Sequence, residues 1–138
     1  MHNAAFAALG LDWTYELLDV APGDLPAALK VLRHHDVAGA NVTIPHKQAV
    51  MQHMDVLDPA AVKARAVNTI ARDGDRLVGS NTDIAAIRAA VASVGVEPKG
   101  AHAVIFGVGG SARAASVALA AARLVPSKVR QSRAARLR

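Results

Sequence analysis

A lysine and an aspartate are the side chains best placed for chemistry. Lys47 stands at the start of a helix predicted from residue 45 or 46 to residue 54, and Asp83 stands at the start of a later one. A cation in the first turn opposes the helix dipole, which favours its deprotonated form, so Lys47 is a candidate acid or base. A solvated surface lysine and an ordinary capping acid are the alternative interpretations of these two residues.

Polar side chains interrupt two otherwise apolar strands. Asn41 and Thr43 alternate with apolar residues at the end of the predicted strand 37–43, and Asn68 lies inside the apolar run 66–71. Buried polar groups need hydrogen-bond partners, which the hydroxyl groups of a ligand could supply. The pattern predicts a polar, hydroxyl-rich ligand.

A glycine-rich turn, Gly107-x-Gly109-x-x-Ala112, follows the predicted strand 101–106 and opens a helix. This is the context of a dinucleotide-binding turn, in which the helix N-terminus offers N–H groups to a pyrophosphate. The acid that an NAD site carries about 20 residues further on is missing, and Lys128 and Arg130 stand there instead. Their charge is compatible with NADP, while a plain strand-to-helix turn remains the alternative.

The hydrophobic pattern predicts elements that would position these residues. Helices are predicted over 2–9, 24–35, 45–54, from 58 onward, 82–95 and 110–123, and strands over 13–20, 37–43, 66–71, 76–80 and 101–106. The strands at 66–71 and 76–80 form a hairpin around 72–75. Because strands alternate with helices, the sequence predicts an α/β fold with a largely parallel sheet.

Charge and composition exclude several classes of protein. The net charge is +5, but all 11 acidic residues precede residue 123, so the excess positive charge lies in the tail. Nucleic acid bound by such a tail would be bound without sequence specificity, and no specific nucleic-acid partner is expected. No apolar run approaches the roughly 18 residues of a membrane span, and the first residues resemble no signal peptide.

Neither disulfides nor a metal site is expected. The sequence contains no cysteine, which points to a reducing cytoplasm. The six histidines show no spacing typical of metal ligands.

Four ordered segments of this sequence resemble the shikimate dehydrogenase family. They are residues 39–47 (GANVTIPHK), 66–70 (AVNTI), 79–83 (GSNTD) and 107–113 (GVGGSAR). Residues 2–6 (HNAAF) are also similar to the first helix of the family, and the resemblance covers about residues 1–122.

The resemblance implies an NADPH-dependent enzyme that reduces 3-dehydroshikimate to shikimate in the chorismate pathway to aromatic amino acids. By position it implies a catalytic pair, Lys47 and Asp83, and substrate ligands Asn41, Thr43 and Asn68. It implies an NADP loop formed by Gly107, Val108, Gly109, Gly110, Ser111 and Ala112. The expected partner is the small-molecule substrate, and a homodimer is a further expectation.

The resemblance also divides the chain. Residues 1–95 correspond to an α/β substrate-binding domain, 101–123 to the first βα unit of a Rossmann NADP-binding domain, and 124–138 to a basic tail that does not match the family. The strand with a Ser-x-Ser motif that opens the family is expected to be missing. We therefore expect very low turnover from this chain. The alternatives are a non-catalytic or unstable fragment that at most binds ligands, and a relative that acts on quinate.

Overall fold

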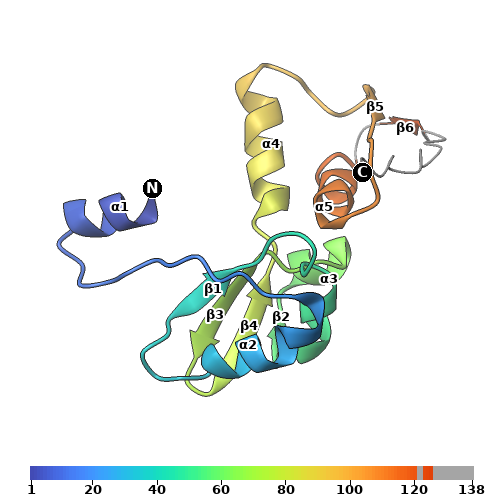
Figure 1. The fold of residues 1–138 in the computed structure, drawn as a ribbon. Coiled ribbons are helices and arrows are strands. Elements are labelled where there is room, and N and C mark those ends of the chain that lie inside the picture. The colour runs from blue at the N-terminus through green and yellow to red at the C-terminus, as the bar shows by residue number, and fades with distance from the viewer. Residues whose placement is uncertain (121–122, 126–138) are drawn as a thin grey trace, which may run out of the picture.

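A four-stranded sheet forms the centre of the computed structural model, which describes residues 1–120 and 123–125 (Figure 1). In the order β1–β3–β4–β2, the strands span Gly39–Asn41, Thr69–Asp73, Arg76–Ser80 and Val56–Leu57. β3 is antiparallel to β1 and β4, and β2 is parallel to β4. The prediction of a largely parallel sheet is wrong for this sheet, because the tight β3–β4 hairpin imposes antiparallel pairing.

The hairpin itself forms where the sequence predicted it. Asp73 pairs with Arg76 next to a two-residue turn, and the ladder ends at the pair Thr69 and Ser80. This register carries Thr69 and Ser80 to one end of the sheet, where Asn68 precedes β3 and residues 81–83 follow β4.

Two short helices and a 3₁₀ helix pack on the sheet. They are α2 (Leu25–Val31), α3 (Pro59–Ala64) and η2 (Ala49–His53). Asp58 caps α3 by accepting a hydrogen bond from the Ala61 N–H, as an Asp-Pro helix start favours. The buried core between these helices and the sheet contains Leu25, Leu29, Leu32, Val50, Ala61, Val67, Ile70 and Leu77.

Two predicted helices are shorter in the structure. The helix predicted over 24–35 divides into a 3₁₀ turn, η1 (Pro22–Asp24), and α2, and the chain turns after Val31. In place of the helix predicted from residue 45, the chain forms an irregular turn over 44–48 followed by η2. The Lys47 carbonyl accepts a hydrogen bond from the Val67 N–H (2.7 Å), a tertiary bond that replaces the regular helical pattern there.

A second, smaller core lies beside the sheet. The helices α4 (Asp83–Ser93) and α5 (Gly110–Ala118) pack against each other, and α5 also contacts α3. The buried residues of this core are Ala64, Ala66, Ile84, Ala114 and Ala118.

A parallel pair of strands, β5 (His102–Val104) and β6 (Arg123–Val125), accompanies α5. α5 ends earlier than the predicted position 123, and β6 occupies residues predicted as the helix end and the start of the tail. The tail over 126–138 lies outside the described residues. Within the described part of the chain, no helix has the length and apolar character needed to cross a membrane.

The N-terminal residues stand apart from the sheet. α1 (His2–Ala8) buries no side chain, and an irregular segment over 9–21 joins it to the body (Figure 1). The strand predicted over 13–20 is wrong, because no strand among the described residues pairs with it. Trp13 and Leu17 remain exposed instead, at 56% and 94%.

Candidate active site

Hydrogen bonds to the residues just before β3 fix the backbone around Lys47. After β1 the chain turns, and the Val42 N–H donates to the Asn68 carbonyl over 2.7 Å, while the Val67 N–H donates to the Lys47 carbonyl. The Lys47 side chain is 13% exposed. Because it precedes a 3₁₀ helix and does not lie in the first turn of an α-helix, the predicted dipole effect is absent, and its surroundings are set by tertiary contacts instead.

Lys47 and Asp83 meet although they lie 36 positions apart in the chain. The Lys47 Nζ donates to the Asp83 Oδ2 over 2.7 Å, and the Asp83 side chain is 26% exposed. Partial burial strengthens such a charge-assisted bond, because less water competes for either partner. The structure therefore brings the two predicted acid–base residues into direct contact.

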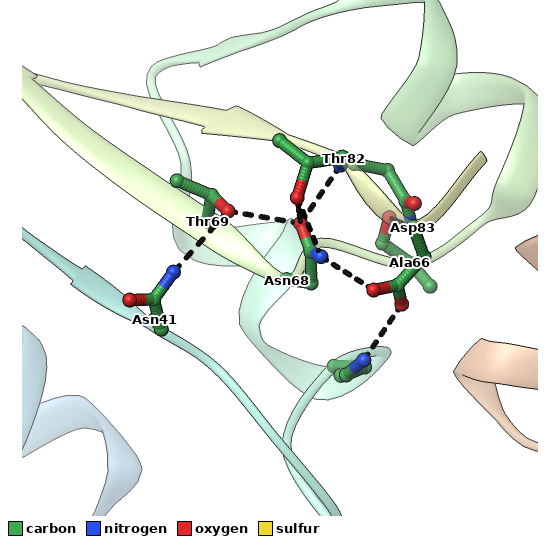
Figure 2. A network of polar contacts seen from close by, with 8 residues as sticks. Asn41, Ala66, Asn68, Thr69, Thr82 and Asp83 are labelled. Atoms are coloured by element: carbon green, nitrogen blue, oxygen red, sulfur yellow. Dashed lines mark hydrogen bonds and ion pairs between the residues drawn. The ribbon is translucent and has the colours of Figure 1, made fainter. Parts of the chain in front are cut away.

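Asn68 is the centre of the polar network in Figure 2. Its Nδ2 donates to the Asp83 Oδ1 (2.7 Å) and to the Thr82 Oγ1 (2.9 Å). Its Oδ1 accepts from the Thr82 N–H (2.9 Å) and from the Thr69 hydroxyl (3.0 Å). With 9% of its surface exposed, Asn68 thus has its donors and acceptor engaged by protein partners, and it holds the carboxylate that faces Lys47.

The network continues outward to β1 and the N-terminal segment. The Asn41 Nδ2 donates to the Thr69 Oγ1 over 3.5 Å, and the Tyr15 hydroxyl donates to the Asn41 Oδ1 over 3.1 Å (Figure 2 shows Asn41, Thr69 and Asn68). Asn41 is exposed. Thr43 is exposed too, and its side chain forms no hydrogen bond within the part of the chain that the structure describes. Both side chains are therefore accessible to a ligand.

Sequence reasoning missed several members of the network as site residues. Thr82 and Thr69 bond directly to Asn68, and the buried Asn81 donates its Nδ2 to the Ala66 carbonyl over 2.9 Å. The sequence feature that could have indicated these residues is the pair of Asn-Thr dipeptides at 68–69 and 81–82, which the β3–β4 hairpin brings together.

The glycine-rich turn packs directly on Lys47. Gly107 has a φ of +122°, a conformation open to glycine and strained for other residues. Gly110 is buried, and a Cβ there would lie 3.0 Å from the Lys47 Cβ and 3.1 Å from its Cδ. The start of α5 therefore rests against the aliphatic stem of Lys47.

A shallow hollow of about 250 Å³ lies along the same turn. Its walls are Gly107, Val108, Ala112, Arg113 and Ser116. A Cβ at Gly109 would meet no atom within 4 Å, so the backbone there is open to a bulky group. Free N–H groups at the start of α5 suit an anion, and these features fit the predicted phosphate-binding turn.

An ion pair at the opposite end of the sheet supports the fold. The Arg33 guanidinium donates to both carboxylate oxygens of Asp55 (2.8 and 3.2 Å), and Asp55 also accepts from the Leu77 N–H over 2.7 Å. The hydrogen bonds from Arg33 and Leu77 hold the pKa of Asp55 below its ordinary value, and the same pairing raises the pKa of Arg33.

Comparison with known proteins places this geometry in a family. The family description "Shikimate dehydrogenase substrate binding domain" matches residues 1–70. The chain belongs to the shikimate dehydrogenase family. The α/β fold of the chain matches the substrate-binding domain of that family.

Full-length family members are similar to the chain over most of its residues. The NADP(+) shikimate dehydrogenase of Moorella thermoacetica is 48% identical over 122 residues, which cover 88% of this chain and 41% of the relative. The shikimate dehydrogenase of Rubrobacter xylanophilus is 48% identical over 125 residues, which cover 90% of this chain and 44% of the relative. The crystal structure of the Thermus thermophilus enzyme in complex with NADP(H) and shikimate is 36% identical, with a TM-score of 0.79 over 89% of this chain and 47% of that one. The chain therefore spans less than half the length of these shikimate dehydrogenases.

Proposed function

We propose that this chain carries the substrate side and the proton-transfer pair of an NADPH-dependent shikimate dehydrogenase, which reduces 3-dehydroshikimate to shikimate. The observation that carries the proposal is the 2.7 Å contact between the Lys47 Nζ and the Asp83 Oδ2. Family membership and the shikimate and NADP(H) bound to the Thermus thermophilus relative support it.

Lys47 is the proposed proton donor to the ketone oxygen. A protonated lysine has three N–H donors, and among the described residues Asp83 alone accepts from the Lys47 Nζ. The other donors can bind the substrate oxygen, stabilise the negative charge that develops on it during reduction, and transfer a proton to it. A lysine that is mostly shielded from water performs this role better than an exposed one.

Asp83 is proposed to orient the lysine. Its Oδ2 accepts from Lys47, and its Oδ1 is held by Asn68, so the carboxylate has one fixed direction. This arrangement would hold the ammonium group toward the ketone oxygen of the substrate and leave it able to donate a proton.

The proposed substrate ligands differ in their availability. Asn41 and Thr43 are exposed and can bond ring hydroxyls without losing a buried partner. Asn68 would have to exchange one of its bonds to a threonine hydroxyl before its Oδ1 could accept from a ligand hydroxyl, and its contact with Asp83 would remain.

The proposed cofactor site is the turn Gly107, Val108, Gly109, Gly110, Ser111 and Ala112, at the start of the proposed second unit, 101–123. When bound, NADPH supplies a hydride to the carbonyl carbon. The residues of the turn would hold the pyrophosphate through backbone N–H groups at the start of α5. The contact of Gly110 with the Lys47 stem supports a cofactor site next to the proposed proton donor.

Binding of shikimate to the 138-residue chain tests the proposal. In a titration followed by two-dimensional amide NMR, shikimate should shift the resonances of residues 41–47, 68–69 and 82–83, and Lys47→Ala should weaken binding about tenfold or more, since a charge-assisted hydrogen bond is lost. Lys63→Ala, at an exposed position on α3, is the matched control and should bind as the original chain does. Equal binding by the Lys47→Ala and Lys63→Ala variants would contradict the role of Lys47.

A second candidate function is ligand binding without turnover, because the exposed Asn41 and Thr43 side chains could bond ligand hydroxyls whether or not a reaction follows. An assay of NADPH oxidation with 3-dehydroshikimate separates the two. We predict a rate far below that of a full-length relative. A comparable rate would exclude the binding-only function, and saturable binding without measurable oxidation would support it.

A further inference from the structure

Three consecutive side chains converge in the turn between α2 and β1. They belong to His34, His35 and Asp36. The His34 Nδ1 lies 3.3 Å from the Asp36 Oδ2, and the His35 Nε2 lies 3.0 Å from the Asp36 Oδ1. One ligand atom from each residue lies within 4.8 Å of the other two, and all three side chains are exposed. Solvent therefore has open access to a point bordered by two imidazoles and a carboxylate.

The backbone that carries these side chains is braced by the sheet. Arg72 of β3 donates to the His35 carbonyl (2.7 Å), the Val37 carbonyl (2.8 Å) and the Gly74 carbonyl (2.8 Å). The Val37 N–H also donates to the His34 carbonyl over 3.0 Å. All these bonds to the turn use its backbone, so they fix the turn and leave the side chains available.

Two imidazoles and one carboxylate form a ligand set that suits Zn²⁺ and neighbouring transition metals. With metal–ligand bonds of about 2.0–2.2 Å, ligand atoms in a tetrahedral site lie about 3.3–3.6 Å apart. The two observed nitrogen–oxygen separations are close to that value, and the ligand atoms all lie within 4.8 Å of one another, so side-chain rotations could bring them into range. We propose that His34, His35 and Asp36 bind one divalent transition-metal ion, with water at the remaining position.

The proposed metal site is independent of the proposed reaction. Gly39 starts β1 next to this turn, whereas the Lys47–Asp83 site lies beyond the other end of the strand, at Asn41. Arg72, the cation bonded to this turn, is engaged by backbone carbonyls, and Arg33 is paired with Asp55. The metal would therefore act on the structure, by fixing the turn between the end of α2 and the start of β1.

Sequence reasoning did not find this site because the three residues are adjacent. In an extended chain, successive side chains point to opposite sides, and spacings such as His-x₃-His identify ligands on one face of a helix. Only the turn that Arg72 braces brings three neighbours to one point.

Calorimetric titration of the untagged 138-residue chain with ZnCl₂ tests the proposal. We expect one saturable site, no saturable binding of Mg²⁺, and at least about tenfold weaker Zn²⁺ binding for His35→Ala. His102→Ala, at an exposed histidine of β5, is the matched control and should bind Zn²⁺ as the original chain does. The absence of a 1:1 site in the original chain, or equal affinity in His35→Ala, would overturn the proposal.

A second variant guards against a loss of structure. Asp36→Asn keeps the shape of the side chain and removes its charge, and it should also weaken Zn²⁺ binding while the far-UV circular dichroism spectrum stays unchanged. In NMR, Zn²⁺ should shift the ring resonances of His34 and His35 before those of His102. An earlier shift at His102 would place the ion elsewhere and reject the site.

Discussion

The sheet region, residues 39–83, and the glycine-turn region, residues 101–120, are stabilised in different ways. Large aliphatic side chains such as Leu77 and Val50 are fully buried in the sheet region. The glycine-turn region buries mainly alanines, and Phe106 is 78% exposed. Burial of a large side chain stabilises by about 1.5–3 kcal/mol, and alanine contributes much less. Most of the stabilisation is therefore expected in the sheet region, which also carries the polar network.

The two regions meet where chemistry is proposed. Gly110 contacts the Lys47 stem, and Ala114 packs in the small core with Ala66 and Ile84. The weaker region is thus positioned by the stronger one. The contact between Lys47 and Asp83 should tolerate changes in the exposed face of the glycine-turn region, but not changes at Gly110.

The largest effect is expected from Leu77→Ala, which removes a fully buried side chain from β4. The cavity and the lost burial should lower the free energy of unfolding by about 2–5 kcal/mol. Urea unfolding followed by far-UV circular dichroism measures this decrease in the free energy of unfolding. Phe106→Ala, the control in the other region, should change stability by less than about 0.5 kcal/mol, and equal losses would refute the comparison.

Asn68→Ala should have the next largest effect. It removes the bonds to Asp83 and to the Thr82 N–H, and the unfolding free energy should fall by about 1–3 kcal/mol because these partly buried hydrogen bonds are lost. Among the described residues, the Asn3 side chain bonds only the exposed Tyr15 backbone, so Asn3→Ala should cost less than about 0.5 kcal/mol. Urea unfolding measures both variants. A similar decrease in the free energy of unfolding would mean that burial does not decide how much these hydrogen bonds stabilise the fold.

Gly110→Ala tests the contact between the regions. The added methyl group would press on the Lys47 stem and on Ala66, and such overpacking should cost about 1–3 kcal/mol. It should also shift the Lys47 side-chain NMR resonances. Gly109→Ala points into open space and should change neither quantity appreciably; an identical response of both variants would show that the two regions do not touch.

The smallest expected effect is on the pH dependence of the free energy of unfolding, and it concerns the sheet region alone. Because Arg33 and the Leu77 N–H lower the pKa of Asp55 in the folded state, this carboxylate stabilises the fold above its ordinary pKa of 3.8. That stabilisation should disappear as the pH falls through the lower folded pKa. Urea unfolding at several pH values measures this effect. Below about pH 4, the free energy of unfolding should depend less on pH in Asp55→Asn and in Arg33→Gln than in the original chain. An unchanged profile in both variants would exclude this pair as its source.

Local features were predictable to different degrees. The β3–β4 hairpin, the Asp58 cap and the βα turn at Gly107 follow from short-range residue preferences, and all three are present in the structure. The strand over 13–20 was wrong although its composition favours a strand, because strand formation also requires a partner in space. The helix beginning at Pro45 was replaced by a turn, since Val67 bonds the Lys47 carbonyl.

The sequence by itself determined the order of the motifs, the family, and the residue types available for acid–base chemistry. The tertiary structure alone decided that Lys47 and Asp83 touch, that Asn68 holds the carboxylate, and that three adjacent side chains at 34–36 converge. Local preferences depend on neighbours along the chain, whereas contacts between distant residues depend on strand pairing and packing. The physical reason is that the hairpin is a local feature, whereas the contact of Lys47 with Asp83 and the hydrogen bonds of Asn68 depend on how distant segments pack, which no periodicity along the chain records.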